Sequence, residues 1–341
     1  MRGIFINSAV SISAQNTFEG DLFDMELPVE STKTISAIHP NYKEYISPAA
    51  SRRMATGVKM GVTAAKRALN IAGVDQPDAI ITGTGMGCIE DSEKFLNAII
   101  ENDEEFLTPT SFIQSTHNTV GAQIALGMKC QAYNMTYVHD SVSFESAVLD
   151  AQLWLDENEA KDVLIGGVDE LGKQFINEML LLEENIQGGI AVPFGEGANF
   201  FVLSVDKGEN CTAKLLSLEI VNRISEKEIN QRTYSFLEQN DMVPSDIDAV
   251  ILGYNGDCFD IYYDSLHEMF KDSAQVQYKF AVGEFYTSSA YAFWLGTQII
   301  RKEEIPQLYL KHNKTKSDIK TILLYNQFKG KQHSFTLITA C

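Results

Sequence analysis

The fold of this chain is decided by the stretch Tyr137-Val138-His139-Asp140-Ser141-Val142-Ser143-Phe144-Glu145-Ser146-Ala147. Its first part is β-branched and aromatic, which favours a strand, and its second part repeats apolar residues near helical spacing. Further along, the next apolar run ends in Gly166-Gly167-Val168-Asp169-Glu170. A strand, a helix and a second strand in this order indicate an α/β protein.

Composition places the chain among globular proteins. Its 341 residues can form one large domain or two fused ones, and 45% hydrophobic with 21% charged residues is an ordinary balance. The formal net charge is -19, and no basic run is interleaved with aromatic residues. This charge argues against nucleic-acid binding and disfavours acidic partners through long-range repulsion.

The sequence carries no sign of a membrane span, a signal peptide or a metal site. No apolar run reaches the roughly 18 to 20 residues needed to cross a bilayer, and the apolar part of residues 1–7 is too short for a signal peptide. The five cysteines are scattered without a CxxC pair, and the six histidines form no HxxxH pattern. We therefore expect a cytoplasmic protein with neither a disulfide framework nor a bound metal.

The hydrophobic pattern alternates between strand and helix along the whole chain. No linker rich in Pro, Gly or Ser divides it, and the segment 206–211 is the best candidate for a seam. We expect an internal duplication, with one half over residues 1–205 and the other over 206–341, packed as one compact unit. The pattern predicts strands over 3–12, 78–83, 134–139, 162–167, 199–205, 213–221, 249–254, 278–282, 321–326 and 334–339, the last two as a pair, and helices over 51–72, 143–157, 226–239, 258–270 and 288–301.

The turn at Ser141 resembles the nucleophile elbow of β-ketoacyl synthases, the condensing enzymes of fatty-acid and polyketide assembly. In that family a cysteine precedes the helix, and the next strand ends in Gly-Gly-(Ala/Val)-(Asp/Glu). The chain most resembles the ketosynthase-like proteins of bacterial aryl-polyene and flexirubin-type pathways. Further matching segments are Ser51-Arg52-Arg53-Met54, the glycine-rich 80–87, the segment 108–122, and Asn326-Gln327-Phe328.

This resemblance implies a thiolase-like fold in which two similar α/β halves pack as αβαβα layers. It also implies a dimer formed across the strand before the nucleophile, here 134–140, and its neighbour 108–119. An acyl tunnel is expected near that interface. The residues that the resemblance assigns to the tunnel or the interface are Phe112, His117, Tyr137, His139 and Phe144.

The resemblance also implies three catalytic side chains, and all three differ here. Ser141 stands in place of the cysteine that accepts the acyl chain. Asn255 and Glu284 stand where the family has the two histidines that promote decarboxylation, although the family's lysine is retained as Lys279. The glycine-rich gate near the end of the family's sequence is replaced by residues 329–332. Three changes together indicate loss of catalysis.

The leading hypothesis is therefore a catalytically deficient subunit similar to a chain-length factor. It would pair with an intact ketosynthase, shape the acyl tunnel and bind no cofactor of its own. It would act with the phosphopantetheine of an acyl carrier protein that docks on the partner. Two alternatives stay open, which are an acyltransferase or hydrolase that uses Ser141 as its nucleophile and a non-catalytic homodimer that binds acyl chains.

Simpler explanations exist for several of these residues. Ser141 is a good helix N-cap, and this is the structural role we expect for it. Ser141 with His139 and Asp140 could form a hydrolase set, but no GxSxG elbow accompanies them. Cys258 could be a reactive thiol, although a small buried apolar side chain is the expectation.

Overall fold

The computed structural model describes residues 3–20, 32–105, 107–184, 188–311 and 318–341. The N-terminal section of its main sheet contains β1 (Ile4–Ile12), β3 (Ala79–Gly83), β4 (Tyr133–Tyr137), β5 (Asp162–Asp169) and β7 (Gly197–Ser204). Strand β7 runs antiparallel to both β1 and β5, whereas β3 runs parallel to β5 and β4. Across the sheet the order is therefore β4-β3-β5-β7-β1.

The C-terminal section repeats this arrangement. It contains β8 (Ala213–Asn222), β9 (Ala249–Leu252), β10 (Ala274–Gln277), β11 (Thr321–Phe328) and β12 (Gln332–Thr339). Strand β12 is antiparallel to β8 and β11, and β9 is parallel to β11 and β10, which gives the order β10-β9-β11-β12-β8. The predicted pairing of the last two strands is confirmed.

The two sections join through their first strands. Ile4–Ile6 of β1 pairs with Ala213–Leu215 of β8, so the ladder continues as one ten-stranded sheet. The repeated order is what an internal duplication would produce, and the boundary between residues 205 and 206 stays a prediction.

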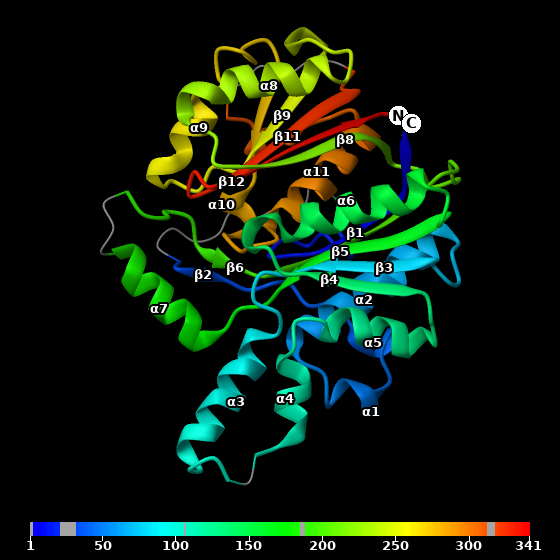
Figure 1. The fold of residues 1–341 in the computed structure, drawn as a ribbon, viewed down its shortest axis with the longest axis vertical. Coiled ribbons are helices and arrows are strands. Elements are labelled where there is room, and N and C mark those ends of the chain that lie inside the picture. The colour runs from blue at the N-terminus through cyan, green and yellow to red at the C-terminus, as the bar shows by residue number, and fades with distance from the viewer. Residues whose placement is uncertain (1–2, 21–31, 106, 185–187, 312–317) are drawn as a thin grey trace.

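Helices form three layers around the two sections, as Figure 1 shows. Two helices lie between the sections. One of them, α11, is buried over almost its whole length because both sections of the sheet and α6 surround it. The expected αβαβα layering is confirmed. The central helices are α6 (Ser143–Asp156) and α11 (Ser288–Lys302), the N-terminal outer face carries α2 (Thr56–Ala72) and α5 (Thr119–Met128), and the C-terminal outer face carries α8 (Ile229–Glu238) and α9 (Ile261–Asp264).

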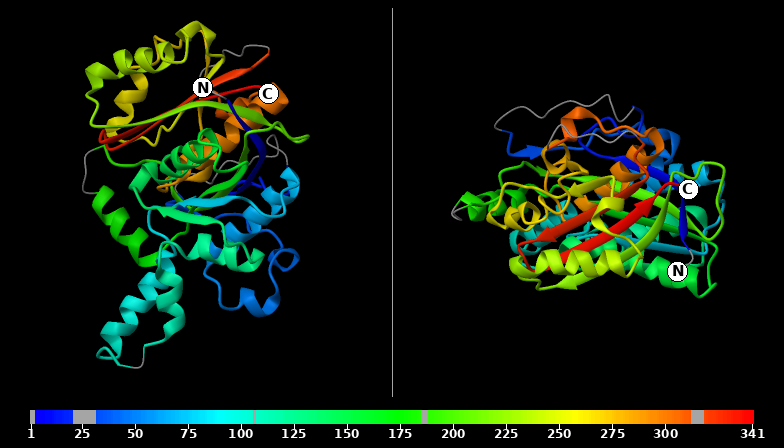
Figure 2. Two further views of the ribbon diagram at one scale, coloured as in Figure 1. Left: turned by 45° about the vertical axis from the view of Figure 1, so that its right-hand side comes forward. Right: turned by 90° about the horizontal axis from the view of Figure 1, so that it is seen from above.

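A helical hairpin projects from the N-terminal section in both Figure 1 and Figure 2. It consists of α3 (Ile89–Glu101) and α4 (Pro109–Ser115), whose rings Phe95 and Phe112 lie 5.3 Å apart. Within α3 only Ile89 is buried. The remaining elements are α1 (Pro48–Ser51), α7 (Lys173–Glu184), α10 (Lys279–Val282), and β2 (Thr34–Ile35) paired with β6 (Phe194–Gly195).

Three predicted elements are wrong in type or length. The helix expected over 51–72 is interrupted between α1 and α2, where Gln114 accepts a hydrogen bond from the backbone of Ala55. The strand expected over 278–282 is the short helix α10, and the strand precedes it as β10. The helix expected over 258–270 ends at Asp264 and continues as turns. Tertiary contacts override local propensity at such places.

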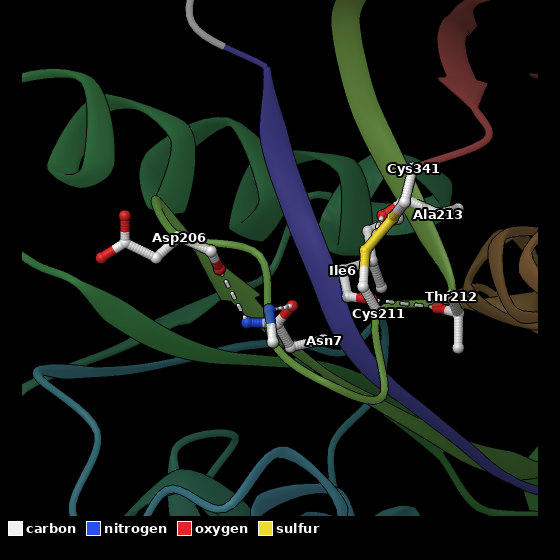
Figure 3. The surroundings of a disulfide bond; sticks show 8 residues. Ile6, Asn7, Asp206, Cys211, Thr212, Ala213 and Cys341 are labelled. Carbon is white, nitrogen blue, oxygen red and sulfur yellow. Dashed lines mark hydrogen bonds between the residues drawn. A yellow bond between two sulfur atoms is a disulfide. The ribbon is translucent and has the colours of Figure 1, made fainter.

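The expectation of unpaired cysteines is also wrong for one pair. Cys211 and Cys341 form a disulfide across Cα atoms 6.7 Å apart (Figure 3). The spacing of cysteines in a sequence does not reveal this, because the two residues are 130 positions apart and meet only through the pairing of β12 with β8. No helix within the described ranges is long and apolar enough to cross a bilayer.

Candidate functional site

Ser141 lies at the turn between β4 and α6, in a short 3-10 segment over Asp140–Val142. Its side chain is buried, and its hydroxyl donates a hydrogen bond of 3.0 Å to Oε1 of Gln332. The expected N-cap role is wrong, because the 3-10 segment begins after His139 and α6 begins after Val142, and neither start has a side-chain cap. The turn packs tightly, since a Cβ at Gly83 of β3 would collide with the backbone of Ser143.

Gln332 reaches Ser141 because a tight hairpin joins β11 to β12. The backbone N–H of Lys331 donates to the carbonyl of Phe328 at 3.0 Å, and the two central residues, Lys329 and Gly330, have φ values of 50° and 61°. Positive φ at both positions is the signature of a type I′ turn. The segment aligned with the family's glycine-rich gate is therefore a strand reversal, and Gln332 also donates to the carbonyl of His139 at 3.3 Å.

The two positions that resemble the family's histidines lie side by side in the C-terminal section. Asn255 donates from Nδ2 to Oε2 of Glu284 at 2.8 Å. The ammonium of Lys279 lies 3.0 Å from Oε1 and 2.9 Å from Oε2 of the same carboxylate. All three side chains are buried. The sequence prediction therefore grouped three residues that the fold does bring together.

The charges in this buried cluster neutralise each other. Burial acts to lower the pKa of Lys279, but the charge and hydrogen bonds of Glu284 outweigh burial and raise that pKa above its ordinary value. Lys279 therefore stays an ammonium ion, and the Glu284 carboxylate binds it through both oxygens. Both oxygens of this carboxylate face donors of the chain itself, which are Lys279 and Asn255.

Asp169, at the end of β5, connects the loop after β3 with the start of α11. Its Oδ1 accepts from the Thr84 hydroxyl, the Gly85 backbone and the Met86 backbone, at 3.0, 2.9 and 3.2 Å. Its Oδ2 accepts from both the backbone and the hydroxyl of Thr287 at 2.8 Å. One buried carboxylate thus ties together loops of both sections around the site.

An apolar cavity of about 40 Å³ lies beside Glu284. Ser141 is not among the residues that line it, so the cavity and the serine are separate features of this structure. Tyr286 lies in its wall, and burial followed by the charges of Asp140, Asp169 and Glu284 raises the pKa of its hydroxyl. The apolar part of the lining includes Phe175, Ile176, Met179, Ile190, Phe194 and Phe328.

The five predicted tunnel or interface residues fall into two groups. Phe112 and His117 are exposed on and after α4, and Tyr137 with His139 lies at the end of β4, where Tyr137 is half-buried and His139 is exposed. Phe144 is buried instead, between Phe201 and Phe293 at 5.6 Å from each ring, and belongs to the central core. The structure therefore does not bring Phe112 and Phe144 together.

The arrangement of a hydrolase set is also absent at Ser141. The Nδ1 of His139 lies 3.0 Å from the hydroxyl of Ser146, which donates to the carbonyl of Val142. Ser141 is hydrogen-bonded to a neutral amide and, among the described residues, to no base. A serine without a base has no means of losing its proton at neutral pH.

Sequence reasoning missed two buried acids near the site and misjudged one cysteine. Glu145 of α6 accepts from the Ser334 hydroxyl at 2.8 Å, and Glu170 accepts from the backbones of Gly57 and Glu90. A glutamate in an amphipathic helix usually faces water, so the sequence carried no signal for Glu145. Cys258 is exposed, contrary to expectation. Within the described part of the chain, no three His, Cys, Asp or Glu side chains are grouped to bind a metal.

Comparison with known proteins gives one match to a family model and several matches in fold. Residues 31–187 match the family model of the β-ketoacyl synthase N-terminal domain. No curated protein sequence matches the chain significantly. The whole chain is similar in fold to solved structures at low sequence identity, which establishes the fold alone.

Three of these structures illustrate the likeness. The ishigamide ketosynthase/chain length factor matches with a TM-score of 0.83 and 14% identity, over 100% of this chain and 99% of that chain. The AntDE:AntF complex, a type II polyketide synthase acyl-carrier protein with its ketosynthase bound to the hexaketide, matches at 0.79 and 13%, over 100% of both chains. The ketosynthase ApeO in complex with its chain length factor ApeC from Xenorhabdus doucetiae matches at 0.73 and 12%, over 100% and 98%.

Proposed function

We propose that this chain, which has the fold of the ketosynthase structures, is a β-ketoacyl synthase-like protein and the non-catalytic subunit of a ketosynthase pair. Its role would be that of a chain-length factor in polyene, polyketide or fatty-acid-type chain elongation. The observation that carries the proposal is the state of the three catalytic positions. Ser141 donates to an amide, and Asn255 and Glu284 are hydrogen-bonded to each other.

The chemistry of condensation explains why these residues count against turnover. The reaction needs a nucleophile that accepts an acyl group and neutral donors that stabilise an enolate oxygen. Ser141 has no neighbouring base in the described structure. The carboxylate oxygens of Glu284 accept hydrogen bonds from Lys279 and Asn255, so this side chain offers no donor to an enolate oxygen. The site is stable as it stands, because its buried polar groups satisfy one another.

The partner would be an intact ketosynthase that docks on the open side of the N-terminal section. Strand β4 is the last strand of the sheet, and the α3–α4 hairpin of the same section exposes Phe112 and Ile113 by 55% and 54%. Exposed apolar surface beside an open strand edge is typical of an interface. The structure of ApeO, a protein of similar fold, is that of a ketosynthase in complex with its chain length factor, ApeC.

The acyl carrier protein would bind mainly to the partner. Its phosphopantetheine would carry the growing chain, and this subunit would hold no cofactor of its own. The net charge of -19 supports this division, since like charges slow association with an acidic carrier. We place the complex in the cytoplasm and, by resemblance, in an aryl-polyene or flexirubin-type pathway.

Affinity purification of the tagged chain from its native cells, followed by mass spectrometry, tests the proposal. A stoichiometric ketosynthase with an intact cysteine and two histidines is the expected result. A homodimer without any ketosynthase would contradict it and favour the acyl-binding alternative.

The acyltransferase or hydrolase alternative has its own readout. The purified chain is incubated with acyl-carrier protein, and its intact mass is compared with that of Ser141→Ala. We expect no acyl adduct on either protein. An adduct that is present in the wild type and absent from Ser141→Ala would make Ser141 a nucleophile and overturn the non-catalytic assignment.

Chain-length control is tested at the interface. Phe112→Ala in the reconstituted complex is expected to change product length, because Phe112 is exposed on the α3–α4 hairpin of the section that would meet the partner. Phe144→Ala is expected to act through stability instead, since Phe144 is packed in the core. Unchanged product length in Phe112→Ala would remove this residue from the tunnel.

A further inference from the structure

The disulfide lies where the two sections of the sheet meet (Figure 3). Cys211 belongs to the segment that connects β7 to β8, and Cys341 follows β12. The bond links residues 130 positions apart, so the closed loop contains every strand of the C-terminal section. No strand of the N-terminal section lies inside that loop.

The segment that carries Cys211 is fastened to β1. Asn7 donates from Nδ2 to the carbonyl of Asp206 at 3.0 Å and accepts from the backbone of Gly208 at 2.8 Å. Thr212 donates to the carbonyl of Ile6 from its backbone at 2.9 Å and from its hydroxyl at 3.0 Å. Cys211 is thereby held at the joint where β1 pairs with β8.

Both cysteines of the disulfide reach the surface of the protein. Cys341 is exposed and Cys211 is partly exposed, in contrast to the buried Cys88. Accessible disulfides react with thiols in solution, whereas buried ones are protected. We propose that Cys211 and Cys341 form a reversible redox staple that fastens the end of β12 to the joint between the two sections.

Closure of the staple balances as a thiol–disulfide exchange. One cysteine thiolate attacks a low-molecular-weight disulfide such as oxidised glutathione, forms a mixed disulfide and releases one glutathione thiolate. The second cysteine thiolate attacks the protein sulfur of that mixed disulfide and releases the second. Two cysteine thiols are oxidised, and one glutathione disulfide is reduced to two thiols.

Closing the staple is expected to stabilise the folded chain and, most of all, strand β12. Closing a long loop restricts the unfolded chain and so favours the folded state. Strand β12 runs from Gln332, which contacts Ser141, to the residues next to Cys341. Reduction is therefore expected to loosen the far end of β12 first, where the strand is next to the staple.

The experiment equilibrates the full chain in a series of reduced-to-oxidised glutathione ratios and then alkylates free thiols. Intact mass and peptide mapping report which cysteines are protected, and thermal unfolding reports stability. We expect Cys211 and Cys341 to become protected together as the ratio falls. The melting temperature should rise on closure by on the order of 5 °C. Hydrogen exchange should slow at the end of β12.

Three serine variants complete the test. Cys211→Ser and Cys341→Ser should abolish the redox dependence of the melting temperature, whereas Cys258→Ser, which removes an exposed free thiol, should retain it. The proposal is overturned if Cys211 and Cys341 are alkylated as readily as Cys258 at every ratio. It is equally overturned if all three variants keep the same redox response. These outcomes do not depend on the partner or on the acyl chemistry.

Discussion

The two sections of the sheet share one strand order but differ at their outer edges. In the C-terminal section the edge strand β10 is covered, because Leu310 bridges to Val276 and the backbone of Lys311 donates to Gln275 at 2.8 Å. In the N-terminal section the equivalent strand β4 has no such cover within the described residues, and Met135 is 39% exposed. The chain closes one edge by itself and leaves the other open, which supports a partner at β4.

The sections also differ in how they hold a buried glutamate. Glu284, in the C-terminal section, is paired with Lys279. Glu170, at the end of β5, accepts only backbone hydrogen bonds from Gly57 and Glu90. Burial raises its pKa to about 7. One acid is neutralised by a lysine and the other by a proton, so the two sections should respond differently to mutation and to pH.

Removing the lysine should give the largest effect. Lys279→Met leaves Glu284 buried with only the amide of Asn255, and an uncompensated buried charge costs about 3–5 kcal/mol of the free energy of unfolding. Urea denaturation measures it. The double variant with Glu284→Gln should recover much of the loss. A loss below about 1 kcal/mol in Lys279→Met would show that the pair contributes little to stability.

Removing the partner of Ser141, which lies before α6 in the N-terminal section, should cost far less. Gln332→Ala removes the acceptor of the Ser141 hydroxyl, which is a single neutral hydrogen bond worth about 1 kcal/mol. Comparable losses in Gln332→Ala and Lys279→Met would contradict the contrast between the two sites.

Exposing the covered edge strand β10 should give the next largest loss in the free energy of unfolding. Tyr309 is fully buried beside β10 and its hydroxyl lies 2.6 Å from that of Tyr291. Tyr309→Ala is expected to cost about 3–4 kcal/mol, because it removes a buried ring. Thermal unfolding and light scattering would report the loss and any association at the exposed edge. Tyr291→Phe, which deletes only a hydroxyl, is the control and should cost about 1 kcal/mol.

Blocking the open edge should weaken the complex and spare the fold. Met135→Asp places a charge on the exposed side of β4, and we expect the affinity for the co-purified ketosynthase to fall about 30-fold. Sedimentation and pull-down measure the change. Val243→Asp, at a residue 53% exposed in the C-terminal section, is the control and should bind normally. Equal binding by both variants would place the interface elsewhere.

The proton on Glu170 should give a pH dependence. Its pKa is raised from 4.5 to about 7 by burial, so the folded state binds the proton more tightly than the unfolded state. The stability that this proton contributes is complete below pH 4.5 and is lost as the pH rises through about 7.

The measurement compares wild type with Glu170→Gln by urea denaturation across that range. Relative to the variant, wild type should lose about 3 kcal/mol between the two limits. The neutral amide keeps one acceptor for Gly57 or Glu90, so the absolute free energies of unfolding of the two proteins will differ. The difference between their slopes against pH therefore reports the proton on Glu170. Parallel slopes would show that Glu170 does not titrate in this window.

Much of the architecture could be read from local pattern, and the errors have physical causes. Strands β1, β3, β5 and β7 have few exposed residues, so their apolar runs were visible. The strand expected over 278–282 was wrong because Lys279 turns inward to meet Glu284, and a helical turn allows that reach. The site residues were located by resemblance, yet their contacts were not, since Gln332 and Ser141 are far apart in sequence.

The sequence by itself determined the residue types at the three altered positions, the alternation of strands and helices, and the acidic charge. These depend on short-range pattern and composition. Only the tertiary structure decided that Lys279 pairs with Glu284 while Asn255 donates a hydrogen bond to it. It also decided that Gln332 accepts from the hydroxyl of Ser141, that Cys211 meets Cys341, and that β10 is covered while β4 is open. Each of these depends on contacts between segments brought together by the packing of two sections, and such contacts leave no local periodicity in the chain.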